Sequence, residues 1–341
     1  MMKAIGIEAH ADQTGVDALV DLELPGPGAP EGHDLLVRVK AVSVNPVDTK
    51  VRRGGNAEQG QPRILGYDAA GVVEAVGPAA KGFNLGDEVF YAGDMTRAGS
   101  NAELQLVDGR IVGPKPRQLD FAEAAAFPLV ALTAWEALFE RFGIDREGAH
   151  AGRTLLIIAG AGGVGSIAIQ LAKLAGLTVI ATASRDETVA WAKELGADAV
   201  VNHHQPIGPQ LEGLGHEGVD YIANFHDTNA YWDTMAEAIR PQGKILSIVG
   251  TTGPVDLGVL MLKSVSFHWE LMFTRSMHQT ADLAQQGAIL REVAALIDAG
   301  QLRPIDRQTL SPINAAQLRA AHEQLESAST IGKLVLAGWA T

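Results

Sequence analysis

The feature that most constrains the fold is a glycine-rich turn, GAGGVG at residues 160–165, between two apolar runs. The run TLLIIA before it is typical of a buried strand, and VGSIAIQLAKLA after it places its apolar residues on one face of a helix. A G-x-G-x-x-G pattern alone is weak evidence, because glycines gather in many turns. In this strand–turn–helix context it predicts a site for the pyrophosphate of a dinucleotide.

Each glycine of this turn is expected for a different physical reason. Gly160 permits the tight turn, Gly162 lets the backbone approach a pyrophosphate, and Gly165 lets the helix pack on the strand. Gly163 and Val164 open the helix, whose free N–H groups and positive dipole end attract phosphates. We predict that these five residues bind the cofactor; a strand–helix turn without a ligand is the alternative.

The pattern on either side of residue 126 differs. Residues 1–126 are short runs rich in Val and Ile between Gly and Pro signals, which indicates a β-rich barrel or sandwich. Strand-like and helix-like runs then alternate, which predicts a parallel sheet covered by helices. The tail mixes both and can rejoin the first domain. We therefore predict an α/β protein with one domain formed by 1–126 and 265–341, and a doubly wound cofactor domain over 127–264.

Composition excludes several classes of protein. The chain has 341 residues, 47% of them hydrophobic, so it can bury a sizeable core. A formal charge of −13 argues against nucleic-acid and membrane partners. There is no cysteine, so disulfides and thiolate metal sites are impossible. The first residues lack the apolar core of a signal peptide, and we expect a cytoplasmic protein.

The end of the second strand predicts which cofactor binds. A carboxylate there grips a ribose 2′-hydroxyl, whereas an arginine accommodates a 2′-phosphate. Here Ser184 and Arg185 occupy the strand end, and the acids Asp186 and Glu187 come after them. Since Arg185 would pair with a 2′-phosphate, we predict NADPH. Ser184 and Glu187 also form a capping-box pattern for the next helix. The alternative is that Asp186 reaches back to the ribose.

Several motifs together carry a family resemblance that covers essentially the whole chain. The sequence resembles the medium-chain dehydrogenase/reductase superfamily, which implies a GroES-like, partly open barrel domain beside a Rossmann domain. The motifs are SVNPVDTKVRRGG (43–55), LGYDAAGVVEAVG (65–77), GDEVFYAG (86–93), FPLVALTAWEALF (127–139), AGAGGVG (159–165), ELGADAVVN (194–202) and IGKLVL (331–336).

The metal-binding loop of that superfamily is altered here. In its zinc alcohol dehydrogenases, the segment matching Gly66-Tyr67-Asp68 reads Gly-His-Glu and supplies a zinc ligand, and a cysteine ligand lies near Asn45. Neither the histidine nor the cysteine is present. His203 and His204 are adjacent and are expected to point to opposite sides of a strand, and no HExxH occurs.

The sequence is instead similar to the zinc-free quinone oxidoreductase branch, whose VNPxD motif is present at 44–48. It looks closest to a subgroup often labelled zinc-type alcohol dehydrogenase-like, a label that its ligands do not support. We therefore expect no bound metal. Tyr67 and Asp68 would be the remains of the metal loop, with Asp68 bracing backbone through hydrogen bonds.

The resemblance implies a set of catalytic candidates. Hydride addition to a quinone or an activated enone leaves negative charge on an oxygen, which must be stabilised or protonated. Asn45 would lie beside the nicotinamide and donate its amide to that oxygen. Lys50 would donate a proton or neutralise an enolate, and Asp48 would orient Lys50 or nearby backbone. Tyr67 contributes if its hydroxyl reaches the substrate. For Lys50 the alternative is a solvated strand end, as most lysines are exposed.

Two further cofactor residues follow from the resemblance. Thr133 matches a position close to the cofactor, although its hydroxyl could simply bond a helix carbonyl. His203 matches a position where relatives touch the adenosine 2′-phosphate. Relatives carry a lysine where this chain has Thr188, which leaves more of the charge to Arg185. The segment SFHWELMF (266–273) would be an apolar wall of the site or ordinary core.

Together these features predict an NADPH-dependent reductase of small quinones or activated carbonyl compounds. The alternatives are a zinc-type alcohol dehydrogenase, a non-catalytic NADPH-binding protein, and an enoyl-thioester reductase. The last would need a basic patch for a phosphorylated carrier, and little beyond Arg52 and Arg53 offers one. The apolar run 255–267 follows the strand GKILSIVG, which ends the predicted sheet. Family members commonly pair through this edge, so we expect a symmetric homodimer.

Overall fold

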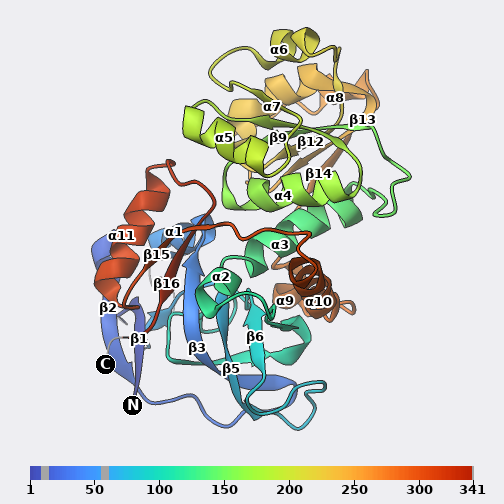
Figure 1. Ribbon diagram of the computed structural model, residues 1–341. Coiled ribbons are helices and arrows are strands. Elements are labelled where there is room, and N and C mark those ends of the chain that lie inside the picture. Colours follow the sequence, from blue (N-terminus) through green and yellow to red (C-terminus); the bar gives the residue numbers. More distant parts are fainter. Residues whose placement is uncertain (9–14, 55–60, 340–341) are drawn as a thin grey trace. The chain divides into compact units, whose positions relative to one another are not determined.

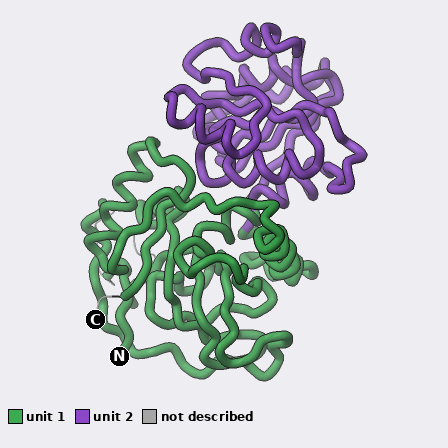
Figure 2. The backbone as a smooth tube through the Cα atoms, viewed as in Figure 1, with its two compact units in different colours: residues 1–132, 273–341 green, residues 133–272 purple. Residues whose placement is uncertain are grey.

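The computed structural model describes residues 1–8, 15–54 and 61–339, so Gly55 at the end of the 43–55 motif lies outside the described residues. Two compact units are present (Figure 2): unit 1 is 1–132 with 273–341, and unit 2 is 133–272. The boundaries expected from the sequence lie at 126/127 and 264/265. Residues 265–272 fall in unit 2 because strand β14 (Ser266–Trp269) pairs with strand β13 (Ile239–Ser247) of that unit.

Unit 2 is built on one parallel sheet, whose strands β13 and β14 are labelled in Figure 1. The strand order is β11-β10-β9-β12-β13-β14, which is the order 3-2-1-4-5-6 of a doubly wound dinucleotide-binding fold. The other strands are β9 (Thr154–Ile158), β10 (Thr178–Thr182), β11 (Ala199–Val201) and β12 (Val219–Asn224). The predicted fold class is confirmed for this unit, and the order reverses between β9 and β12, next to the glycine-rich turn.

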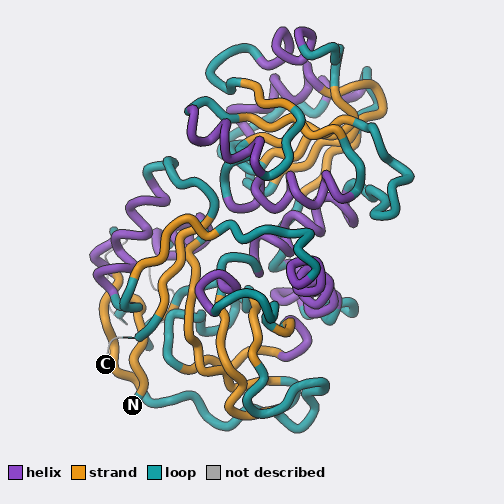
Figure 3. The backbone as a smooth tube through the Cα atoms, in the orientation of Figure 1, coloured by secondary structure: helices purple, strands orange, loops and turns teal. Residues whose placement is uncertain are grey.

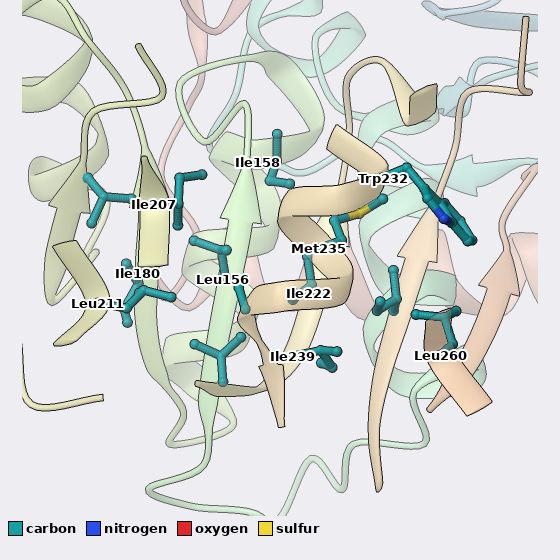
Figure 4. Packing of buried hydrophobic residues seen from close by; sticks show 14 residues of the cluster. Leu156, Ile158, Ile180, Ile207, Leu211, Ile222, Trp232, Met235, Ile239 and Leu260 are labelled. Atoms are coloured by element: carbon teal, nitrogen blue, oxygen red, sulfur yellow. The ribbon is translucent and has the colours of Figure 1, made fainter. Parts of the chain in front are cut away.

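Helices cover both faces of this sheet (Figure 3). They are α4 (Gly163–Leu174), α5 (Asp186–Glu194), α6 (Ile207–Gly213), α7 (Thr228–Ala238) and α8 (Gly258–Met261). On the α6–α7 face, Leu156 and Ile222 of the strands pack against Trp232 and Met235 of α7 (Figure 4). Because both faces are buried, the strands are continuous apolar runs, and every residue of β9 is buried.

The edge of this sheet differs from the sequence expectation. GKILSIVG was expected to be the last strand, but β14 pairs with β13 in parallel and forms the edge instead. The apolar run 255–267 therefore contributes α8 and the first part of β14. Several large apolar side chains on this run and just after it are exposed: Leu257, Val259, Met261, Leu262, Trp269 and Leu271.

Unit 1 contains two sheets formed mainly by antiparallel pairs. The larger has the order β15-β16-β3-β5-β6-β8, with β7 paired to β3, and the smaller has the order β2-β1-β4. The strands are β1 (Met2–Ile7), β2 (Leu19–Leu24), β3 (Asp34–Val44), β4 (Arg63–Ile64), β5 (Ala69–Val76), β6 (Glu88–Tyr91), β7 (Leu104–Asp108), β8 (Gly113–Pro114), β15 (Asp306–Leu310) and β16 (Lys333–Ala337). The expected return of the tail is confirmed, since β16 pairs with β3.

Helices complete unit 1. They are η1 (Val16–Ala18), α1 (Pro46–Arg53), η2 (Gly109–Ile111), α2 (Phe121–Ala125), α9 (Thr274–His278), α10 (Gln285–Asp298) and α11 (Ala315–Glu326). Helix α3 (Pro128–Trp135) crosses the boundary between the units and is followed by a π-helical turn, η3 (Glu136–Arg141). Within the described residues, no helix is both long and apolar enough to cross a bilayer. The β3–α1 junction and the start of β16 position the site described next.

Candidate functional site

The glycine-rich turn follows β9 and opens α4, as predicted. The left-handed residue of the turn is Ala159, with φ 65°, rather than Gly160. The backbone N–H of Ala159 is held by the Thr182 hydroxyl at 3.0 Å. Gly160 is required by packing, because a Cβ there would lie 2.7 Å from the Cβ of Ala181. Ala159 therefore makes the tight turn that was expected to depend on Gly160. Gly160 is needed for a different reason, because Ala181 on the adjacent strand leaves no room for a side chain.

Two other glycines of the turn show where a ligand fits. A Cβ at Gly165 would lie 2.4 Å from the Ala159 carbonyl oxygen, so close packing of helix on strand excludes any side chain there. At Gly162, the residue that caps α4, a Cβ would make only an ordinary 3.5 Å contact. The protein itself therefore does not require glycine at 162. An open backbone at a helix N-terminus fits a pyrophosphate.

The predicted cap of α5 is wrong by one residue. Arg185 is the N-cap, its N–H donates to the Thr188 hydroxyl at 3.1 Å, and that hydroxyl donates to the Arg185 carbonyl at 2.8 Å. Ser184 is not needed as a cap. Its Oγ lies 3.4 Å from Nε2 of His203, which follows β11. Ser184 and His203 thus meet at the carboxyl edge of the sheet, beside the exposed Arg185.

The two histidines do not point to opposite sides of a strand. β11 ends at Val201, and His203 and His204 lie in the following turn with ring centroids 4.3 Å apart. Burial lowers the pKa of His203, and the neighbouring His204 and His226 lower it further. Thr133, the remaining predicted cofactor residue, is buried in α3.

A buried polar cluster forms where β3 meets α1, and we call it the Asn45 cluster: Ser43, Asn45, Asp48, Asp68 and Lys333. Asn45 is the residue before α1, yet its side chain does not cap that helix. Instead its Nδ2 donates to Asp68 at 2.7 Å, and its Oδ1 accepts from Lys333 at 2.6 Å. Its backbone N–H donates to Asp48 at 2.7 Å. Asp48 therefore orients backbone, one of the two roles that the sequence left open.

Asp68 is the most heavily hydrogen-bonded member of the cluster. Its Oδ1 accepts the Leu129 backbone N–H at 2.7 Å, which confirms the predicted bracing of backbone. Its Oδ2 accepts from Ser43 at 2.9 Å and from Lys333 at 3.2 Å, in addition to Asn45. Lys333 also donates to the Val44 carbonyl at 2.9 Å.

These partners define the charges of Asp68 and Lys333. Burial lowers the pKa of Lys333 and raises that of Asp68, while their mutual attraction opposes both shifts. Three acceptors surround the Lys333 nitrogen, and a neutral amine with two hydrogens would leave one of them unmatched. The neighbours of Asp68 are donors. We therefore infer a buried ion pair.

Asp48 is the member of the cluster that titrates near neutral pH. Burial raises its pKa to about 7, against the Asn45 N–H and the charge of Lys333, which lower it. Its Oδ1 is buried and accepts no hydrogen bond from the described part of the chain, although the Gly66 backbone lies near enough to lower the pKa slightly.

The other two catalytic candidates differ in exposure. Tyr67 is buried, and its ring meets that of Phe273 edge to face with centroids 5.4 Å apart. Burial raises the pKa of Tyr67 to about 12, and the charge of Asp48 adds to this. Lys50 lies on α1 rather than at a strand end, is exposed, and makes no side-chain hydrogen bond or ion pair to a described residue.

The donors at this loop do not fit zinc. Asp68 accepts four hydrogen bonds, one from an ammonium group that would repel a cation. Tyr67 stays a neutral phenol at neutral pH because its pKa is raised. The chain has no cysteine, and no group of three or more His, Asp or Glu residues suited to a metal occurs in the described ranges.

Lys333 is the site residue that sequence reasoning missed. The motif IGKLVL was used only as a family signal, although a lysine inside an apolar strand is unusual and implies a buried partner. That partner could not be named, because Asn45 and Lys333 are 288 positions apart.

Comparison with known proteins identifies close relatives. The family described as zinc-binding dehydrogenase matches residues 163–286, and the alcohol dehydrogenase GroES-like domain matches 31–125. A zinc-type alcohol dehydrogenase-like protein of Staphylococcus epidermidis is 42% identical over 98% of this chain and 99% of its own length.

Solved structures agree with these matches. A Rhizobium etli CFN 42 protein assigned to the zinc-dependent alcohol dehydrogenases superimposes with a TM-score of 0.93 at 48% identity, covering 100% of this chain and 99% of its own. A quinone oxidoreductase of Pseudomonas syringae pv. Tomato DC3000 superimposes with a TM-score of 0.84 at 28% identity, covering 99% of this chain and 100% of its own.

Proposed function

Because this chain belongs to the medium-chain dehydrogenase/reductase superfamily, we propose that it transfers a hydride from NADPH to a quinone or an activated α,β-unsaturated carbonyl compound without a metal. The resemblance drawn from the sequence motifs is confirmed, including the quinone oxidoreductase-like branch and the GroES-like and Rossmann domains. The chain is thus an oxidoreductase with a dinucleotide-binding fold, and the proposal concerns its cofactor, substrate and chemistry.

One observation carries the proposal. The Lys333 ammonium contacts the loop that holds the metal in zinc enzymes and neutralises Asp68, the acidic residue of that loop. A Lewis acid is thereby replaced by hydrogen-bond donors as the means of polarising a substrate oxygen. Quinones and activated enones suit such a site, since they accept hydride without prior activation by a metal.

The residues then have the following roles. The turn from Gly160 to Gly165 holds the pyrophosphate, and Arg185 pairs with the 2′-phosphate beside Ser184 and His203. When bound, the dinucleotide supplies the hydride. Asn45 stabilises the negative charge that develops on the substrate oxygen, and Tyr67 contributes if its hydroxyl reaches that oxygen.

Steady-state oxidation of NADPH with a panel of quinones and enones tests the proposal, together with elemental analysis of the purified protein. We expect turnover that chelators leave unchanged and less than stoichiometric zinc. One zinc per chain with chelator-sensitive alcohol oxidation would support the zinc-type alcohol dehydrogenase instead. Tight NADPH binding with no turnover on the panel would support a non-catalytic binding protein.

The structure offers little to an enoyl-thioester carrier. Of the two arginines considered for a basic patch, Arg52 is buried against Nδ1 of His322 at 2.9 Å. The guanidinium of Arg53 lies 3.1 Å from the Glu326 carboxylate. Both are therefore committed to the α1–α11 contact, and this alternative is tested by including an enoyl thioester in the panel.

A further inference from the structure

In the Asn45 cluster, one amide hydrogen of Asn45 is not used by the hydrogen bonds among the described residues. The three hydrogens of the Lys333 ammonium go to the Val44 carbonyl, Asn45 Oδ1 and Asp68 Oδ2. The Asp68 carboxylate accepts from four groups. Of the two Nδ2 hydrogens of Asn45, one goes to Asp68, and the second has no acceptor among the described residues.

The ammonium also determines which way the Asn45 amide faces. If the amide were turned over, its oxygen would face Asp68 Oδ2 across 2.7 Å, and its NH₂ would face the ammonium across 2.6 Å. Both contacts would then be repulsive, so only one orientation satisfies the cluster. The backbone of Asn45 is fixed in addition by Asp48 at 2.7 Å.

We propose that Lys333 is a positioning residue, which holds the Asn45 amide so that its one uncommitted N–H is the donor to the substrate oxygen. This inference rests on the proposed reduction of a quinone or enone. The ammonium also withdraws electron density from the amide oxygen, which makes the remaining N–H a stronger donor. A donor already aimed at the developing charge costs no reorganisation during the reaction.

The test compares two buried lysines of unit 1. Lys333→Met removes the ammonium from Asn45. Lys115→Met is the matched control, because Lys115 is similarly buried and bonds the Pro116 carbonyl at 3.0 Å and the Glu88 carboxylate at 3.1 Å, away from the cluster. We expect Lys333→Met to lower kcat by roughly 10- to 100-fold with KM changed far less, and Lys115→Met to leave both unchanged.

A double-mutant cycle separates positioning from a loss of folding. In an Asn45→Ala background, Lys333→Met should cause little further loss of kcat, because the residue through which it acts is gone. If Lys333→Met misfolds with Asp68 unpaired, the Lys333→Met/Asp68→Asn pair removes both charges and takes its place. The proposal would be overturned if the fold-loss of kcat in the double variant equalled the product of the fold-losses in Asn45→Ala and Lys333→Met. A folded Lys333→Met protein whose kcat lies within about twofold of that of Lys115→Met would overturn it as well.

A readout without turnover keeps this inference separate from the proposed function. In protein labelled with ¹⁵N at asparagine, the two side-chain amide protons of Asn45 should differ in shift and in exchange with solvent. Lys333→Met should move both resonances and Lys115→Met neither. Unchanged Asn45 resonances would refute the positioning role whatever the enzyme reduces. Moved resonances in a protein inactive on the whole panel would refute the proposed function alone.

Discussion

Lys333 and Asp68 form a buried ion pair, with Nζ 3.2 Å from Oδ2, across 265 positions of sequence. The pair joins the start of β16 to the residue before β5 and places a fixed positive charge beside the Gly66–Asp68 loop. Buried charges are costly to desolvate, so such a pair is stable only with its full set of hydrogen bonds. The cluster supplies that set.

Removing one member of the pair should act mainly on stability. Asp68→Ala removes the negative charge paired with the Lys333 ammonium and the carboxylate that accepts the Leu129 N–H, and we expect it to lower the free energy of unfolding by about 3–5 kcal/mol. Arg117→Ala is the control, because its ion pair with Asp298 is on the surface and should contribute less than about 1 kcal/mol. Urea unfolding followed by fluorescence measures both, and equal small losses would contradict the buried pair.

The stability of the Asn45 cluster should depend on pH through Asp48. Its pKa is raised from 3.8 to about 7, so folding favours the protonated carboxyl. Protonation of Asp48 contributes about 4 kcal/mol to the free energy of unfolding. This contribution is complete below about pH 4 and is lost as pH rises through about 7. Relative to Asp48→Asn, the wild-type free energy of unfolding should therefore fall between pH 4 and 7 and level off above. A constant difference would show that Asp48 stays ionised.

Two glycines of the turn should separate packing from ligand binding. Gly165→Ala places a Cβ 2.4 Å from the Ala159 oxygen and should lower stability without cofactor by about 1–3 kcal/mol. Gly162→Ala meets only a 3.5 Å contact and should cost about 1 kcal/mol or less as a helix cap. Its effect should instead be weaker dinucleotide binding, measured by fluorescence titration. Unchanged affinity in Gly162→Ala would place the pyrophosphate elsewhere.

Arg185 should decide between the two nicotinamide cofactors. We expect Arg185→Ala to weaken NADPH binding by roughly 1.5–3 kcal/mol, the scale of a charge-assisted hydrogen bond, and to leave NADH binding nearly unchanged. Lys193→Ala, which removes an exposed positive charge from the same helix, is the control for net charge. Equal losses for both cofactors on titration would argue against a 2′-phosphate contact.

The exposed edge of the unit 2 sheet should form a symmetric dimer. Met261 and Leu262 are 73% and 90% exposed, close in sequence to β14, the edge strand that pairs only with β13 among the described residues, and apolar edges of this kind invite a second copy. Light scattering at micromolar concentration should give a molar mass of twice the chain mass. Leu262→Lys should reduce the measured mass to that of a single chain. Leu85→Lys, at a leucine of unit 1 that is 74% exposed, should leave the measured mass unchanged. A monomeric wild type would refute this assembly.

The sequence by itself determined those elements whose structure depends on residues close together in the chain. The glycine turn, the strand before it and the helix after it were recognisable because periodicity and turn chemistry act within a few residues. The parallel sheet covered by helices followed from the alternation of strand-like and helix-like runs along the chain.

Only the tertiary structure decided which distant groups meet. The cap of α5 moved to Arg185 because the Thr188 hydroxyl bonds it, and β14 became the sheet edge because its backbone pairs with β13. Above all, pairing of β16 with β3 brings Lys333 to Asn45 and Asp68. No periodicity records such a contact, because its energy comes from long-range strand pairing and shared burial rather than from the residues beside it in sequence.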